Sequence, residues 1–252
     1  NNPFFTNLAK ENEEVTLTMI ADELVTPPTV VFKSNDDPIL NTTVTVTPST
    51  GTNTDYTAKY TVNASDTNGS VSFEVSGFQD GNENVGNTST AVTDTSSVTI
   101  DTTSPTLSKV VMTSSNTLNN SLAKSGETVT LDISVNEHIN TPSISFSSDS
   151  QTITGPITIT GENDSYTAQF GVNASDKDGP VSFTISNLSD LAGNLLSDVT
   201  ALTSGTTVTI DKTAPSLSTV TLQSNNNENT DFAKSGDSVE LTIAANEDIT
   251  TP

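Results

Sequence analysis

The amino-acid sequence predicts an all-β fold, an elongated array of tandem β-sandwich domains, and two observations carry this prediction. Hydrophobic residues alternate with Thr, Asp and Ser in short segments such as VTLDISV, in which Val129, Leu131, Ile133 and Val135 share one side. A period of two is typical of a strand with one buried face. The second observation is internal repetition, because long segments recur in the same order along the 252-residue chain.

The recurring segments fix the length of the repeat. SLAKSGETVTLDISVNEHINTP (121–142) returns 110 residues later as DFAKSGDSVELTIAANEDITTP (231–252), and a looser copy, NLAKENEEVTLTMIADELVTP, lies at 7–27. DYTAKYTVNASDTNGSVSFEVSGFQD (55–80) matches SYTAQFGVNASDKDGPVSFTISNLSD (165–190), again 110 residues later. Copies at a constant distance indicate an array of similar units.

The repeat boundaries divide the chain into three parts. Residues 1–100 are a repeat that lacks its first strand, residues 101–210 are a complete repeat, and residues 211–252 are the start of a third. Because both ends fall inside repeats, we expect the chain to be a window of a longer array.

About seven short strands are predicted in the complete repeat, separated by turns rich in Gly, Asn, Asp and Pro such as ASDKDGP. No stretch shows helical periodicity. Seven short alternating strands in about 100 residues favour an immunoglobulin-like sandwich. The residues predicted to point inward, besides those of VTLDISV, are Val110, Met112, Ile144, Phe146, Tyr166, Ala168, Phe170, Val172, Val181, Phe183, Ile185, Val208 and Ile210.

Charge limits the partners of the chain. With 31 acidic and 8 basic residues its formal net charge is −23, so nucleic acid and anionic membrane surfaces would be repelled. No apolar run is long enough to span a membrane, and we expect no membrane insertion of this segment. There is no cysteine, which excludes disulfides and thiolate metal sites. Divalent cations such as calcium are the natural counter-charge.

No catalytic group of residues emerges from the sequence. His138, the single histidine, aligns with Leu24 and Asp248 in the other copies, and the many serines have no base beside them in any motif. The paired acids Asp36 and Asp37 lie in a polar loop in which nothing would raise a pKa for acid catalysis. We therefore expect that the chain is not an enzyme.

The repeated motifs resemble a known family. D-x-T-x-P-x-L, A-K-x-G-[DE]-x-V-x-L, N-E-x-I-x-T-P, G-P-V-S-F-x-I and D-x-A-G-N occur in this order, and together they resemble the bacterial Ig-like tandem repeats of large surface adhesins and extracellular fibre proteins. The resemblance covers nearly the whole chain and implies an extracellular or cell-surface location. The first copy departs from it, with ENEE after Lys10 and DGNEN in place of DLAGN.

Topology predicts a calcium site at each joint between repeats. In such a sandwich alternate loops gather at opposite poles, so acids of the linker and of three loops should converge where two repeats meet. Calcium takes six to eight oxygens at about 2.3–2.6 Å. The predicted ligands are Asp66, Asp101, Glu137 and Asp190 at the first joint, and Asp176, Asp178, Asp211 and Glu247 at the second.

A simpler interpretation of the same acids remains open. Asp and Asn favour turns because their side chains bond nearby backbone amides, so an acid recurs wherever a turn recurs. The lysines that recur at Lys10, Lys124 and Lys234 are interpreted as solubilising side chains on exposed turns.

Two functional hypotheses follow. The first is a structural stalk or spacer of a long extracellular repeat protein, whose partners are its own neighbouring repeats, while a cell-surface or carbohydrate ligand is bound elsewhere in the protein. The alternative is a surface-, carbohydrate- or ice-binding module that uses Thr-rich strand faces such as TVTVT (Thr43–Thr47). A flat, regular threonine array within one sheet would favour the alternative.

The incomplete repeats pose a last question. The first copy should expose a sheet edge and apolar interior where its first strand is missing, while residues 217–222 and 239–245 form a spare pair of strands. Either a continuing covalent chain supplies the missing strand, or a separate chain donates one. We favour the covalent chain, because donation would leave residues 239–245 without a partner.

Overall fold

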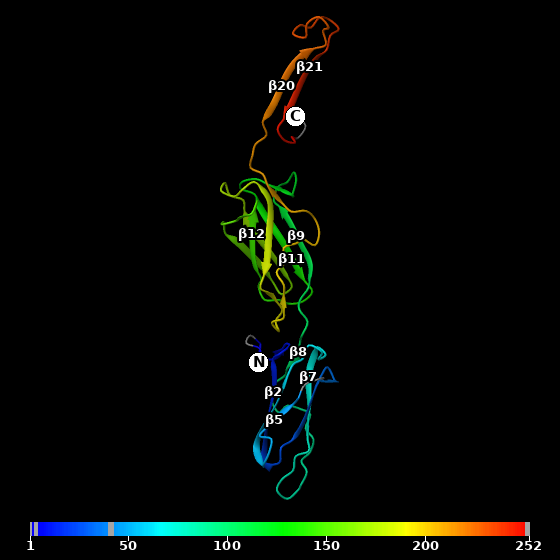
Figure 1. Cartoon of the computed structure of the whole chain (residues 1–252), viewed down its shortest axis with the longest axis vertical. Coiled ribbons are helices and arrows are strands. Elements are labelled where there is room, and N and C mark those ends of the chain that lie inside the picture. The colour runs from blue at the N-terminus through cyan, green and yellow to red at the C-terminus, as the bar shows by residue number, and fades with distance from the viewer. Residues whose placement is uncertain (1, 3–4, 40–42, 250–252) are drawn as a thin grey trace.

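The computed structural model describes residues 2, 5–39 and 43–249, which contain strands and loops but no helix. Residues 1, 3–4 and 40–42 of the predicted first repeat and residues 250–252 of the predicted third lie outside the described residues. Figure 1 shows the units following one another along the long axis of the molecule. Within the described part, no helix has the length and apolarity needed to cross a membrane.

The complete repeat is a sandwich of two main sheets. One has the order β14-β15-β11-β9, formed by Ile157–Glu162, Ser165–Gly171, Thr128–Val135 and Leu107–Ser114. The other has the order β10-β19-β16-β12-β13, formed by Leu122–Ala123, Thr209–Ile210, Gly179–Ser186, Ser143–Ser148 and Gln151–Thr152. The pairing is antiparallel except between β10 and β19, which run parallel. A short pair, β17 (Leu188–Ser189) and β18 (Leu195–Leu196), closes one end.

The two main sheets of the first repeat have the same strand order, but the described residues of that repeat form no strand equivalent to β9 and no pair equivalent to β17 and β18. These sheets have the orders β2-β6-β5, formed by Glu14–Val25, Asn53–Thr61 and Thr45–Thr47, and β1-β8-β7-β3-β4, formed by Leu8–Ala9, Thr99–Ile100, Gly69–Ser76, Thr29–Ser34 and Asp37–Pro38. The pair β1 and β8 is again parallel. No described strand of this repeat takes the place that β9 has beside β11.

The core of the complete repeat consists of the residues that the alternation predicts. Val129, Leu131, Ile133 and Val135 are all buried in β11, and their neighbours Thr130, Asp132 and Ser134 are only half-buried. Phe146 and Phe170 pack at 4.9 Å between ring centroids in the centre of the sandwich. Of the residues predicted to point inward, Ile144 alone is half-buried instead of fully buried. The chain is therefore all-β, built from tandem immunoglobulin-like sandwiches.

The core of the first repeat is less closed where the strand is missing. Leu17 and Met19 occupy the positions of Leu131 and Ile133, yet they are only half-buried. In the complete repeat β9 covers these positions, because Met112 pairs with Leu131 and Val110 with Ile133.

The last described segment is a single hairpin. β20 (Leu217–Ser224) pairs antiparallel with β21 (Val239–Ala245), and together they extend from the upper end of the molecule in Figure 1. Their apolar side chains are exposed, including Val220, Leu222 and Leu241. Two isolated strands are marginal in stability without a further sheet to pack on.

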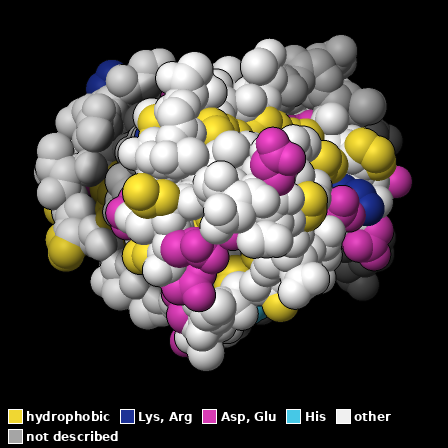
Figure 2. Space-filling model, turned by 90° about the horizontal axis from the view of Figure 1, so that it is seen from below, with side chains coloured by type: hydrophobic (Ala, Val, Ile, Leu, Met, Phe, Trp, Pro, Cys, Tyr) yellow, Lys and Arg dark blue, Asp and Glu magenta, His cyan; other side chains and the backbone are white. Residues whose placement is uncertain are grey.

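The surface agrees with the acidic composition. In the view from the lower end, acidic side chains lie scattered over a largely uncharged polar surface and basic ones are few (Figure 2). Such a surface disfavours contact with polyanions.

Candidate functional site

The linker between the first two repeats is fastened to the repeat that follows it. Asn136, in the loop after β11, accepts a 2.6 Å hydrogen bond from the Thr106 N–H at Oδ1, and its own N–H donates to the Thr106 carbonyl at 3.0 Å. The same clasp recurs at the next joint, where Asn246 bonds Ser216 in both directions. The Asn of the N-E motif therefore holds the entering chain against the loop that carries the glutamate.

Three carboxylates converge beside this clasp. One oxygen from each of Asp101, Glu137 and Asp190 lies within 4.8 Å of the other two. Asp101 belongs to the linker, Glu137 to the loop after β11, and Asp190 to the loop between β17 and β18. Asp101 and Glu137 are half-buried, whereas Asp190 is only 1% exposed.

Asp190 is held rigidly by the D-x-A-G-N motif. Its Oδ1 accepts hydrogen bonds from the Gly193 N–H at 2.6 Å and the Asn194 N–H at 2.8 Å, and its Oδ2 accepts one from Asn194 Nδ2 at 2.7 Å. Gly193 has a φ of +92°, a left-handed conformation that favours glycine. The motif thus fixes a buried carboxylate. Three of its roughly four lone-pair sites accept these hydrogen bonds, and one remains available to a ligand.

Asp101 is held by both repeats. Its Oδ1 accepts from Asn68 Nδ2 at 2.9 Å and from the Thr103 N–H at 3.1 Å. Its carbonyl oxygen accepts from Asn194 Nδ2 at 2.8 Å. Asn68 lies in the loop before β7 of the first repeat, so the linker acid joins side chains of two sandwiches.

The electrostatics of the cluster call for a counter-charge. Burial raises the pKa of the Asp101 carboxyl, the hydrogen bond from the Thr103 amide opposes this, and the charge of Asp190 raises it further. Burial also raises the pKa of the Glu137 carboxyl, with the charges of Asp101 and Asp190 adding to the rise and the Asn136 hydrogen bond opposing it. Burial is therefore the main reason that the ionised forms of Asp101 and Glu137 are disfavoured, and repulsion from the neighbouring carboxylates adds to it.

The donor set fits a calcium ion. Two oxygens that each lie about 2.4 Å from one ion are at most about 4.8 Å apart, and the three carboxylates meet this limit. Three acids supply hard oxygen ligands, and backbone carbonyls and water are the usual sources of the rest.

Asp66 and Asp176 do not join such a group. Asp66 Oδ2 accepts from the Asn63 N–H at 2.9 Å, and Asp176 Oδ2 accepts from the Asn173 N–H at 2.8 Å. Both side chains are buried within their own turn. In the loop before β7, Asn68 and not Asp66 reaches Asp101. The turn-forming interpretation therefore describes these two acids.

The second joint is arranged differently. Asp178, which aligns with Asn68, accepts from Thr213 Oγ1 at 2.9 Å and lies 3.5 Å from the Lys212 ammonium. The Thr213 hydrogen bond is the main cause that lowers the pKa of the Asp178 carboxyl. Asp211 Oδ1 accepts from the Thr213 N–H, and Glu247 Oε1 is buried without a hydrogen-bond partner. Among the described residues, three acids do not converge here.

Lys10, one of the recurring lysines, does more than the solubilising role predicted from the sequence. Lys10 Nζ donates a 2.7 Å hydrogen bond across the joint to the Gly193 carbonyl, and Asn2 Nδ2 donates one of 2.7 Å to the Ala192 carbonyl. A Cβ at Gly193 would lie 3.4 Å from Lys10 Nζ, an ordinary van der Waals contact, so the glycine is required by its left-handed backbone and not by the lysine. Lys10 places a positive charge on the loop that carries Asp190.

Replacing Lys10 with methionine should loosen this joint while both sandwiches stay folded. The substitution removes the cross-joint hydrogen bond and its charge but keeps most of the side-chain volume. Small-angle scattering and residual dipolar couplings should report a wider range of angles between the first two repeats. Lys124→Met is the matched control, because Lys124 is the exposed equivalent and lies away from this joint. Identical angles in Lys10→Met and wild type would contradict the cross-joint role.

Comparisons with known proteins find only distant similarities to solved structures. No protein-family model matches the sequence, and no curated protein matches it. Among solved structures, the titin domains Z1Z2 in complex with telethonin share 14% identity at a TM-score of 0.26, over 82% of this chain and 91% of theirs. The titin tandem I9–I11 shares 12% identity at a TM-score of 0.36, over 84% and 65%. The ectodomain Ig1–Ig3 of mouse nectin-like molecule 4 shares 14% at 0.33, over 94% and 75%.

These identities and scores carry no information about function. The sheet order, the separate cores and the clasped linker define the class of the protein, a tandem of immunoglobulin-like repeats joined end to end.

Proposed function

We propose that this chain is a stalk or spacer segment of a long extracellular repeat protein, a surface adhesin or filament. The observation that carries the proposal is the joint itself, in which the linker acid Asp101 bonds Asn68 of one repeat and Asn194 of the next. Contacts from both sides restrict bending, and a spacer needs such restriction to hold its length. The acidic surface and the absence of cysteine are compatible with a location outside the cell.

Calcium at the first joint is the second part of the proposal. Asp101, Glu137 and Asp190 would be its ligands, and the two positive charges of the ion would offset most of the repulsion among the three carboxylates. The ion would also tie the linker to two loops of the following repeat, so the joint would stiffen when calcium is present.

The test compares the full chain in calcium and in chelator. Calcium should raise the melting temperature of the complete repeat and narrow the range of joint angles in small-angle scattering, and chelator should reverse both. Calorimetric titration should show a site that Glu137→Gln weakens. Glu23→Gln is the matched control, because Glu23 is the equivalent acid of the first repeat and is exposed. Equal melting, scattering and heats in calcium and in chelator would remove calcium from the proposal.

The threonine-rich strand faces give only partial support to the alternative function, a surface-, carbohydrate- or ice-binding module. Thr18, Thr57 and Thr47 lie side by side across β2, β6 and β5, as a binding array would require. One row away, however, Lys59 pairs with Glu14 at 2.7 Å and interrupts the array.

In the complete repeat a charged pair interrupts the threonine array as well. There Asp132 stands where the first repeat has Thr18, and it pairs with Lys109 at 3.3 Å. A charged pair in each repeat favours the spacer. Binding of the chain to a polysaccharide or to ice, lost in Thr57→Lys, would favour the alternative.

A further inference from the structure

The linker that leaves the complete repeat is fastened to a turn of that repeat. Lys212 is the second residue after β19, and its ammonium lies against the turn between β15 and β16. It donates a hydrogen bond of 3.0 Å to the Ala174 carbonyl and another to the Asp176 carbonyl. The Asp178 carboxylate lies 3.5 Å from the same ammonium. Three oxygens of one turn therefore lie around one positive charge.

This arrangement differs from the surface ion pairs of the chain. The Lys212 side chain is 21% exposed, whereas the paired side chains of Lys177 and Asp149 are 55% and 58% exposed. Two of the acceptors are main-chain carbonyls, which do not titrate. The turn that carries them is rigid, because the buried Asp176 carboxylate accepts a hydrogen bond from the Asn173 N–H. Hydrogen bonds from a charged donor in such a place are stronger than an exposed ion pair.

The first joint indicates that the lysine and the acid act as a pair. Asn68 and Thr102 stand there in place of Asp178 and Lys212, so both positions are uncharged in one joint and oppositely charged in the other. The Thr102 N–H donates to Asn68 Oδ1 at 2.9 Å, and the Lys212 N–H bonds the Asp178 carboxylate in the same way. Both joints keep this backbone contact, and the second joint adds the ammonium.

We propose that the turn 173–178 and Lys212 form an ammonium site that holds the linker leaving the complete repeat without a metal ion. The ammonium occupies the space beside Asp176 and Asp178, two of the acids for which the sequence predicts calcium binding. A linker held by a charge of its own chain stays fastened at any calcium concentration.

Calcium and the ammonium exclude one another at this turn. Both are cations that would use the Asp178 oxygens, and two like charges about 4 Å apart repel. Calcium could enter only if Lys212 gave up two hydrogen bonds. The linker of the second joint should therefore not respond to calcium on this side, in contrast to the first joint. Only this contrast rests on the calcium proposed for the first joint, and the lysine site itself does not.

Amine labelling of the full chain tests the site directly. An acylating reagent modifies a lysine only when its amine is deprotonated and free of hydrogen bonds. Lys212 should react about ten-fold more slowly than Lys177, because hydrogen bonds from a charged donor must break first. Mass spectrometry of the labelled peptides gives both rates, and labelling in chelator tests the site whether or not calcium binds at the first joint. Equal rates for the two lysines, or faster labelling of Lys212 in calcium, would overturn the proposal.

Two variants separate the ammonium from the rest of the joint. Lys212→Thr removes the charge and leaves the Asp178 carboxylate without its cation, so the amides of residues 211–213 should exchange with solvent about ten-fold faster. Adding Asp178→Asn copies the pair of the first joint. There the Asn68 amide donates to the linker acid Asp101 at 2.9 Å, and the same contact in the double variant should return exchange towards the wild-type rate.

Lys177→Met is the matched control. Lys177 belongs to the same turn, but its ammonium faces Asp149 at the surface, so the linker amides should keep their wild-type exchange rates. Circular dichroism confirms that each variant keeps its folded repeats. Unchanged exchange in Lys212→Thr would overturn the proposal. So would a double variant in which Asp178→Asn fails to slow the exchange that Lys212→Thr has raised.

Discussion

Leu131→Ala should destabilise the complete repeat by about 2–5 kcal/mol. Leu131 is fully buried in β11, between β9 and β15 and beneath the second sheet. Removing its side chain leaves a cavity that strands on both sides cannot close. Denaturant-dependent hydrogen exchange would locate the loss, because amides of the complete repeat should exchange faster and those of the first repeat should not.

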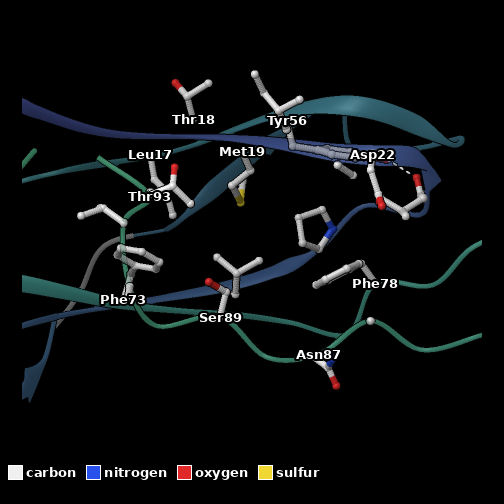
Figure 3. A pocket seen from close by; sticks show the side chains of 18 of the residues that line it. Leu17, Thr18, Met19, Asp22, Tyr56, Phe73, Phe78, Asn87, Ser89 and Thr93 are labelled. Carbon is white, nitrogen blue, oxygen red and sulfur yellow. Dashed lines mark hydrogen bonds between the residues drawn. The ribbon is translucent and has the colours of Figure 1, made fainter. Parts of the chain in front are cut away.

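Leu17→Ala provides the matched comparison. Leu17 is the equivalent residue of the first repeat but is half-buried in β2, an edge strand among the described strands (Figure 3), so its truncation removes less contact and should cost clearly less. Equal losses at Leu131 and Leu17 would mean that Leu17 is packed as closely in solution as Leu131.

Asp190→Ala should cost about 3 kcal/mol even without calcium. The carboxylate is buried and accepts three hydrogen bonds, and its removal leaves the Gly193 and Asn194 donors without partners. The loop between β17 and β18 should lose its shape, and the contacts of Lys10 and Asn194 across the joint should go with it. Thermal denaturation gives the stability loss, and dipolar couplings give the change at the joint.

Asp80→Ala is the control for this effect. Asp80 accepts the two equivalent hydrogen bonds from Asn84 and a third from the Asn82 N–H, but its loop is exposed, so water can replace the lost acceptor. Its effect on stability should be much smaller. A similar loss in both variants would mean that the hydrogen bonds of the motif, and not the burial of Asp190, determine the cost.

Much of the fold could be predicted because alternation in a sandwich is a direct consequence of burial. Each residue of β11 that the period of two turns inward is buried, and Leu17 and Met19 follow the same phase in the first repeat. Leu17 and Met19 are only half-buried, because no described strand lies beside β2 as β9 lies beside β11. Ile144 departs from the pattern because it lies near the end of β12, where the sandwich is open to water.

The joint could be predicted only in part. Topology places the loops of Asp101, Glu137 and Asp190 at one pole, and their carboxylates do meet. It does not tell which residue of a tight turn folds back on the turn, as Asp66 does, and which reaches the neighbour, as Asn68 does. The role of Lys10 was missed because aligning repeats with one another reveals recurrence within a unit but not contact between units.

The parallel pair β10 and β19 has a mechanical consequence. The chain enters the complete repeat at the end beside the first repeat and leaves through β19 at the end beside the hairpin (Figure 1). Tension on the two ends must first pull β9 from β11; it then pulls β10 and β19 in opposite directions along their length, so their hydrogen bonds are loaded together and in shear. If the two strands were separated from one end, their hydrogen bonds would break one at a time. If one strand is displaced along the other, all of these hydrogen bonds must break at once. The first repeat has the same arrangement in β1 and β8. Each unit should therefore resist stretching more than its small core suggests.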